Sequence, residues 1–151
     1  MARLLVIGFG NPLRGDDAFG FAAAEQFSGR VAGSGVEVLA LHQLAPELME
    51  QVSQAGSVVF IDASLEGPPG ELRRTAVTPA ESASPEAFTH HLTPQALLAG
   101  TKAVYGRAPE AVLYTVGAAT FEFGAAMSSE VAHALDRLVA ELGNIVSNHG
   151  V

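Results

Sequence analysis

Short apolar runs alternate with amphipathic segments along this chain, and the alternation predicts strands and helices in turn. Continuous aliphatic runs of this length, closed by glycine or polar residues, are typical of strands buried on both faces. The runs cover residues 4–8, 36–41, 58–62 and 111–117. A weaker pattern over residues 71–77, within a proline-rich stretch, predicts one added strand.

Helix signals lie between these runs. Asp16 or Asp17 is expected to cap a helix over about 18–27, and Pro46 is expected in the first turn of the next helix. An N-cap and first-turn pair, Thr93-Pro94, predicts a helix that ends at Gly106. Ser128 is expected to cap the last helix. That helix carries one apolar face, made of Val131, Leu135, Leu138, Leu142 and Ile145.

Strands alternating with helices predict an α/β fold over residues 1–151 as a single domain. We expect three layers, α/β/α, with a mostly parallel twisted sheet of about five strands and helices on both faces. In open sheets of this kind, ligands bind in the crevice at the carboxyl ends of the strands. The polar residues that follow the strands are therefore the candidates for chemistry.

The amino-acid composition excludes or disfavours several classes of function. Hydrophobic residues make up 48% and charged residues 16%, which is typical of a folded globular domain. The chain has no cysteine, so disulfides, thiolate metal ligands and a cysteine nucleophile are excluded. A net charge of -8 disfavours nucleic acid as a partner. No apolar run approaches the ~20 residues that span a bilayer, and no signal-peptide pattern is found, so we expect a cytoplasmic protein that does not enter the membrane.

The first strand leads into a glycine-rich loop over residues 8–20, which raises the question of nucleotide binding. The G-x-G-x-x-G spacing fails because Leu13 stands at the third glycine position, and no Lys-Ser/Thr pair follows. Two aspartates at the start of a helix would also repel a phosphate. A nucleotide-binding module is therefore the weaker hypothesis.

Asp62 ends a strand in the expected centre of the sheet, where a carboxylate is costly unless it meets a cation or several donors. His90 and His91 precede the Thr93-Pro94 helix start, and His42 follows the second strand. One imidazole beside two carboxylates suits a borderline divalent metal and leaves coordination positions open. The structural alternative is that the aspartates are helix caps and the histidines are solvated.

The loop Gly8-Phe9-Gly10-Asn11-Pro12-Leu13-Arg14-Gly15-Asp16-Asp17-Ala18-Phe19-Gly20 resembles the opening signature of hydrogenase maturation proteases, G-N-x-L-x-x-D-[DE]-x-x-G. Two later segments, Phe60-Ile61-Asp62-Ala63 and Thr89-His90-His91-Leu92, are similar to the other two signatures of that family, in the same order. The resemblance covers nearly the whole chain.

The resemblance implies an endopeptidase that recognises nickel in the [NiFe]-hydrogenase large-subunit precursor and removes its C-terminal peptide. It also implies that the nickel arrives with this substrate and is bound by Asp17, Asp62 and His90, with His91 as the alternative to His90. The catalytic group stays unassigned, although Asp17 and Asp62 are expected to take part. Asn11 and Gln43 are expected to contact the substrate.

Many members of that family have an aspartate just after the second strand, whereas this chain has Ala40-Leu41-His42-Gln43-Leu44. This turn resembles the H-Q-L-x-P-E-L version found in relatives that serve bidirectional, NAD-linked hydrogenases. Two alternatives remain: a peptidase of the same fold acting on another precursor, and a noncatalytic metal-sensing or nucleotide-binding module.

Overall fold

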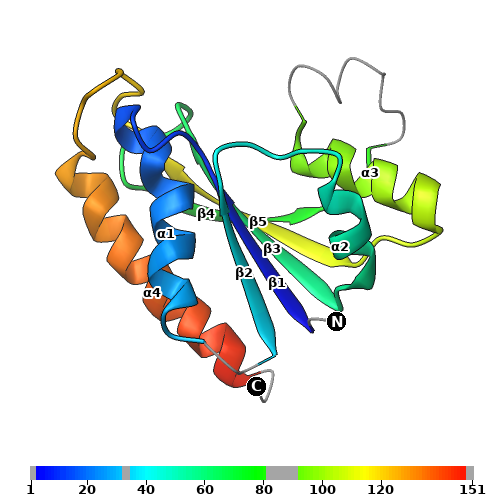
Figure 1. The fold of residues 1–151 in the computed structure, drawn as a ribbon. Coiled ribbons are helices and arrows are strands. Elements are labelled where there is room, and N and C mark those ends of the chain that lie inside the picture. The colour runs from blue at the N-terminus through cyan, green and yellow to red at the C-terminus, as the bar shows by residue number, and fades with distance from the viewer. Residues whose placement is uncertain (1–2, 32–34, 81–91, 149–151) are drawn as a thin grey trace.

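The computed structural model describes residues 3–31, 35–80 and 92–148 (Figure 1). Strands and helices alternate along the chain, as the hydrophobic pattern predicts, except that the fourth strand follows the third directly. In chain order the elements are β1 (Leu4–Phe9), the 3-10 helix η1 (Gly15–Ala18), α1 (Phe19–Ser28), β2 (Val36–Leu41), α2 (Leu48–Gln54), β3 (Ser57–Ser64), β4 (Leu72–Val77), α3 (Pro94–Tyr105), β5 (Glu110–Gly117) and α4 (Ser129–Asn148).

The five strands form one sheet in the order β2-β1-β3-β5-β4. The pairs β1–β2, β1–β3 and β3–β5 are parallel, and β4 alone runs antiparallel, on the outer side of β5. The connection from β3 to β4, residues 65–71, is too short to hold the crossover helix that a parallel neighbour needs, so β4 returns in the opposite direction. The predicted five-stranded, mostly parallel sheet is confirmed, with β3 at its centre.

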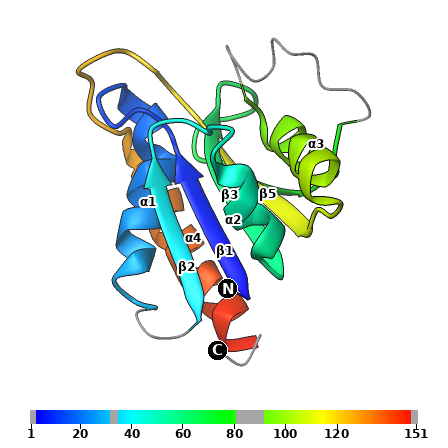
Figure 2. The same cartoon turned by 45° about the vertical axis from the view of Figure 1, so that its right-hand side comes forward.

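Helices cover both faces of the sheet, with α1 and α4 on one face and α2 and α3 on the other (Figures 1 and 2). Alternate residues of β1 enter the two cores: Val6 packs in the core beneath α1 and α4, and Ile7 packs in the core beneath α2 and α3. Because the inner strands are covered on both sides, the middle residues of β1 and β3, 5–7 and 58–61, are all apolar rather than alternating with polar ones.

The structure confirms the predicted ends of α3 and the predicted apolar face of α4. The Thr93 hydroxyl accepts a hydrogen bond from the backbone N–H of Ala96 at 3.1 Å, and Gly106 ends α3 in the left-handed conformation at φ 80°. In α4, the predicted apolar face is confirmed, since Val131, Leu135, Leu138 and Leu142 are buried and Ile145 packs against the same core. No helix in the described part of the chain is long and apolar enough to cross a membrane.

One predicted helix start and one predicted helix cap are wrong. Helix α2 begins at Leu48, and Pro46 lies in the turn before it, where its carbonyl accepts from the N–H of Met49. Helix α1 begins at Phe19, and no side chain caps its first turn. Neither Asp16 nor Asp17 caps α1, because both lie in η1, a separate turn of 3-10 helix that holds their side chains for other contacts.

Candidate active site

A cleft of about 750 Å³ opens at the carboxyl ends of β1, β2 and β3. All four predicted site residues that the structure describes line this one cleft: Asn11, Asp17, Gln43 and Asp62. The full lining consists of Phe9, Gly10, Asn11, Arg14, Asp17, residues 42–47, Asp62, Ala63, Leu92 and Phe121. The topological rule that ligands gather at this edge of a parallel sheet therefore selects the same place as the sequence motifs.

Asp17 is held in the cleft by the loop that follows β1. Its Oδ2 accepts a hydrogen bond from the backbone N–H of Asn11 at 2.9 Å. The Asn11 Oδ1 accepts in turn from the N–H of Leu13 at 2.9 Å, so the side-chain amide Nδ2 of Asn11 is left without a partner among the described residues. The loop thus fixes one oxygen of Asp17 and presents an amide donor of Asn11 beside it.

The glycines of this loop allow the chain to pack closely around Asp17. A Cβ atom on Gly10 would collide with the carbonyl oxygen of Asp17, and one on Gly8 would collide with the carbonyl oxygen of Gly20. The glycine pattern is therefore explained by contact between β1, its loop and the start of α1. Because Asp17 takes up the N–H of Asn11, that loop amide is not available to a phosphate, which weakens the nucleotide-binding hypothesis.

Asp62 lies on β3, the central strand, and is half-buried at the floor of the cleft. Burial raises the pKa of its carboxyl to about 7, the hydrogen bond from the N–H of Ala63 at 2.8 Å opposes this shift, and the negative charge of Asp17 adds to it. The two carboxylates therefore repel each other in a poorly solvated place. A proton or a cation would relieve that repulsion.

Asp16 supports the site from within the fold, whereas the sequence indicated only a possible helix cap at this position. It is completely buried, and its carboxylate accepts hydrogen bonds from the N–H of Ala119 at 2.8 Å, the N–H of Ser128 at 2.7 Å and the hydroxyl of Ser128 at 2.9 Å. It thereby joins η1 to the loop 118–128 and places a negative charge beside the start of α4, where the helix dipole favours it. The Asp-Asp doublet was the available signal, but it could not show which aspartate turned inward.

Several other residues line the cleft without having been predicted as ligands or substrate contacts, among them Arg14, His42 and Phe121. His42 is exposed, and its ring packs against Phe21 of α1 with centroids 5.5 Å apart and planes tilted by 57°. His42, which follows β2, therefore lines the same cleft as the two aspartates. Arg14 stands inside the loop motif, whereas Phe121 follows β5 and carries no sequence signal that would place it here.

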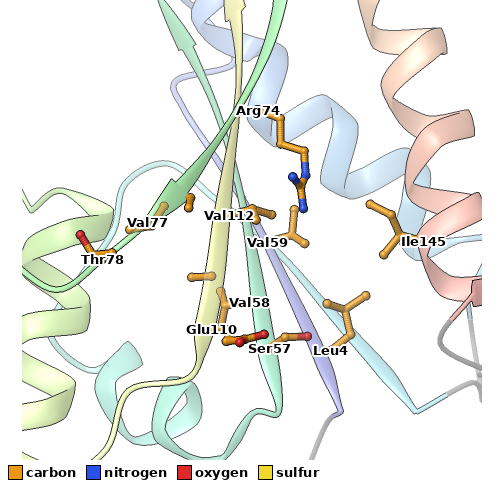
Figure 3. A pocket seen from close by; sticks show the side chains of 12 residues that line it. Leu4, Ser57, Val58, Val59, Arg74, Val77, Thr78, Glu110, Val112 and Ile145 are labelled. Atoms are coloured by element: carbon orange, nitrogen blue, oxygen red, sulfur yellow. The ribbon is translucent and has the colours of Figure 1, made fainter.

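A second cavity, of about 440 Å³, lies away from the carboxylates. It is lined mainly by apolar side chains near the amino ends of the strands, together with Arg74 of β4 and Ile145 of α4 (Figure 3). Leu4, Ser57 and Glu110 mark those amino ends. Its lining includes neither of the paired aspartates, so the chemistry belongs to the cleft at the opposite end of the sheet.

No protein-family model matches the sequence, and no curated protein matches it. Solved structures do match. The [NiFe] hydrogenase maturation protease HycI from Thermococcus kodakarensis aligns with a TM-score of 0.77 and 24% identity, over 97% of this chain and 93% of its own. The hydrogenase maturating endopeptidase HybD from E. coli gives 0.78 and 21%, over 98% and 94%. An endopeptidase from Escherichia coli, solved in solution, gives 0.76 and 22%, over 99% and 94%.

The chain has the fold of the hydrogenase maturation proteases. At these identities the shared property is the fold, so the activity has to be argued from the site. Within the described residues, no group of three His, Cys, Asp or Glu side chains is placed to hold a metal ion. The predicted third ligand, His90 or its alternative His91, lies outside the described residues. Two carboxylates that share one cleft are the part of the predicted donor set that the structure describes.

Proposed function

We propose that this chain is an endopeptidase that recognises nickel in the [NiFe]-hydrogenase large-subunit precursor and removes the C-terminal peptide of that precursor in the cytoplasm. The observation that carries the proposal is the pairing of Asp17 and Asp62. They come from separate elements and line one cleft, where burial raises the pKa of Asp62 and the negative charge of Asp17 adds to that rise. The fold shared with maturation proteases supports the same conclusion.

In this proposal the nickel belongs to the substrate. Asp17 and Asp62 offer oxygen ligands, and His90, or His91 in its place, adds an imidazole nitrogen, a set that suits nickel. Leu92 lines the cleft and is joined to His91 by one peptide bond. Once bound, the ion supplies a Lewis acid for the scissile carbonyl or for the attacking water.

Nickel recognition also explains how cleavage would be confined to the right precursor. In the free chain, Asp62 is poorly solvated beside a second negative charge, which is an unfavourable arrangement. A precursor that presents its nickel relieves this arrangement, whereas a precursor without nickel does not. The difference in binding free energy selects the nickel-loaded substrate.

Two other residues are proposed to hold the peptide. The side-chain amide nitrogen of Asn11 has no partner among the residues that the structure describes, and Gln43 is exposed and lines the cleft after β2. Both present amide groups that can hydrogen-bond to an extended backbone. The His42-Gln43-Leu44 turn supports a precursor of the bidirectional, NAD-linked hydrogenase type as the substrate.

The test is processing of a nickel-loaded large-subunit precursor, followed by mass spectrometry at its carboxyl end. Wild type should release the peptide, and Asp17→Asn, Asp62→Asn and His90→Ala should not. Asp136→Asn, an exposed aspartate of α4, is the matched control and should process normally. If His90→Ala stays active and His91→Ala does not, the ligand is His91.

A noncatalytic metal-sensing module is the competing function. On that interpretation wild type would bind the nickel-loaded precursor, or nickel itself, without shortening the precursor. If wild type binds cognate precursors but processes none of them, the metal-sensing function replaces the proposed endopeptidase activity.

A further inference from the structure

Hydrogen bonds join two loops beside the cleft, the loop after β1 and the loop after β5. The N–H of Asp16 donates to the carbonyl of Thr120 at 2.9 Å, and the N–H of Gly124 donates to the carbonyl of Leu13 at 2.7 Å. The buried Asp16 carboxylate adds its three hydrogen bonds to residues 119 and 128. In both ribbon views the loop after β5 runs beside the loop after β1 (Figures 1 and 2). Side chains on these loops are therefore presented from a fixed backbone.

The joined loops expose two large apolar side chains next to the cleft. Leu13 is 59% exposed and Phe123 is 70% exposed, and the hydrogen bond between Gly124 and Leu13 brings their backbones together. Phe121, two residues before Phe123, lines the cleft itself. An exposed Phe is unfavourable in water, and apolar and aromatic side chains grouped at the edge of a cleft are typical of a binding surface.

Arg14 follows Leu13 in the chain and lines the same cleft as the carboxylates. It lines the cleft, and no Lys or other Arg does so among the described residues. Its Nε donates to the carbonyl of Phe121 at 3.2 Å, which orients the guanidinium, while its two terminal amino groups have no partner in the described structure. No carboxylate of the described residues forms an ion pair with it, although the chain has 16 acidic residues and 8 basic ones.

An oriented guanidinium with free terminal amines matches a carboxylate, because the planar fork donates two parallel hydrogen bonds. No carboxylate of the described residues occupies this position, so it is open to a carboxylate of a ligand. The cleft also contains Asp17, Asp62 and Glu47, so a single cation among acids fixes where a negatively charged group of a ligand can be placed.

We infer that Leu13, Arg14, Phe121 and Phe123 form a substrate-docking rim, in which Arg14 binds a carboxylate of the protein substrate and the apolar side chains cover the residues next to it. The inference rests on the proposed function, because the occupant is the peptide that enters the cleft. The carboxylate is either the C-terminal carboxyl of the precursor or an Asp or Glu side chain near the cleavage site.

Steady-state processing of the nickel-loaded precursor tests the rim. Arg14→Gln should raise KM about tenfold or more, the loss expected for a charged hydrogen bond, and should leave kcat within about twofold. The rise should shrink as salt is added, because salt already weakens the wild-type contact. Arg14→Lys keeps the charge without the fork and should restore part of the affinity.

The apolar half is tested separately with Phe123→Ser and Leu13→Ser, each of which should raise KM without the salt dependence. Controls are Arg30→Gln, an exposed arginine that lies outside the cleft, and Val104→Ser, an exposed apolar residue of α3. Both controls should retain the wild-type KM. Thermal unfolding of every variant, followed by circular dichroism, confirms that the fold is kept.

Substrate variants identify the carboxylate. If Arg14 binds the chain terminus, a precursor with a C-terminal amide should show the raised KM with wild type and no further rise with Arg14→Gln. If Arg14 binds a side chain, one Asp→Asn or Glu→Gln change near the cleavage site of the precursor should raise the KM of wild type. The same precursor should then show no further rise with Arg14→Gln. An unchanged KM for Arg14→Gln, with Asp62→Asn inactive, overturns the docking rim and leaves the proposed enzyme standing. Absence of wild-type processing overturns both.

Discussion

Asp17 and Asp62 lie on different elements and far apart in the sequence, yet the negative charge of Asp17 adds to the rise that burial causes in the pKa of Asp62. Both side chains line one cleft at the carboxyl edge of the sheet. Desolvation at the end of the central strand is the larger cause of the shift, and the neighbouring carboxylate strengthens it. Burial and the neighbouring charge both favour a proton or a cation at Asp62, and together they give the first prediction a definite sign.

Stability should fall with rising pH because of Asp62. Its pKa rises from 3.8 to about 7 on folding, so between these values the folded protein holds a proton that the unfolded chain has lost. The Asp62 contribution is therefore favourable at about pH 4, declines through pH 7 and is constant above it. At about 1.4 kcal/mol per pKa unit, the upper bound of the change is roughly 4 kcal/mol.

Asp62→Asn removes this titration and keeps an oxygen for the N–H of Ala63. In metal-free buffer the variant should match wild type near pH 4 and be more stable near pH 8. Urea unfolding at both pH values measures the difference. Equal effects at the two pH values would show that the Asp62 carboxyl has an ordinary pKa in the folded protein.

Replacing Asp16 should lower the free energy of unfolding more than replacing an exposed aspartate. Asp16→Ala leaves the N–H groups of Ala119 and Ser128 without their acceptor and removes a buried charge-assisted network, which should cost about 3 kcal/mol or more. Asp136→Ala, on the exposed face of α4, should change stability by less than about 0.5 kcal/mol. Chemical denaturation compares the two. A small effect of Asp16→Ala would mean that water replaces the lost acceptor.

Replacing glycine by alanine should change the free energy of unfolding in opposite directions at two positions. Gly8→Ala places a methyl group against the backbone of Gly20, so it should destabilise by roughly 1 to 3 kcal/mol. Gly143→Ala, in α4, meets nothing within 4 Å and should stabilise by up to about 1 kcal/mol through helix propensity. Thermal unfolding gives both values. Similar melting temperatures for the two variants would contradict the close packing of α1 against β1.

Nickel should stabilise the isolated chain through the proposed ligands. An excess of Ni²⁺ about 100 times its Kd should add about 2.7 kcal/mol, which corresponds to a rise in Tm of roughly 5 to 10 °C. Asp17→Asn and His90→Ala should reduce that rise, and Asp136→Asn should retain it. A rise of the same size in all four proteins would place the nickel somewhere else, for example on the tail that contains His149.

The strands and the closing helices were predictable because their signals are local. An apolar run buried on both faces needs no partner to be recognised, and Thr93, Pro94 and Gly106 act within one turn of their own helix. The edge strand β4 was predicted as a strand, whereas its antiparallel direction depended on the short connection before it. The start of α2 was misplaced because Pro46 is equally acceptable in a turn that precedes a helix.

The cleft could be located from the sequence, because residues that follow parallel strands must meet at the same edge. Asp17, Asp62, Asn11 and Gln43 therefore lie in one cleft as expected. Phe121 and the orientation of Arg14 could not be anticipated, since they depend on hydrogen bonds between two loops about one hundred residues apart in the chain.

The sequence by itself determined the alternation of elements, the sheet edge where the chemistry lies and the chemical types gathered there. Only the tertiary structure decided what the adjacent aspartates do. Asp16 turns inward to Ala119 and Ser128, and Asp17 faces the cleft beside Asn11. The two carboxyl groups are chemically identical, so their roles follow from the direction in which η1 points each side chain and from donors that only the folded chain brings within reach.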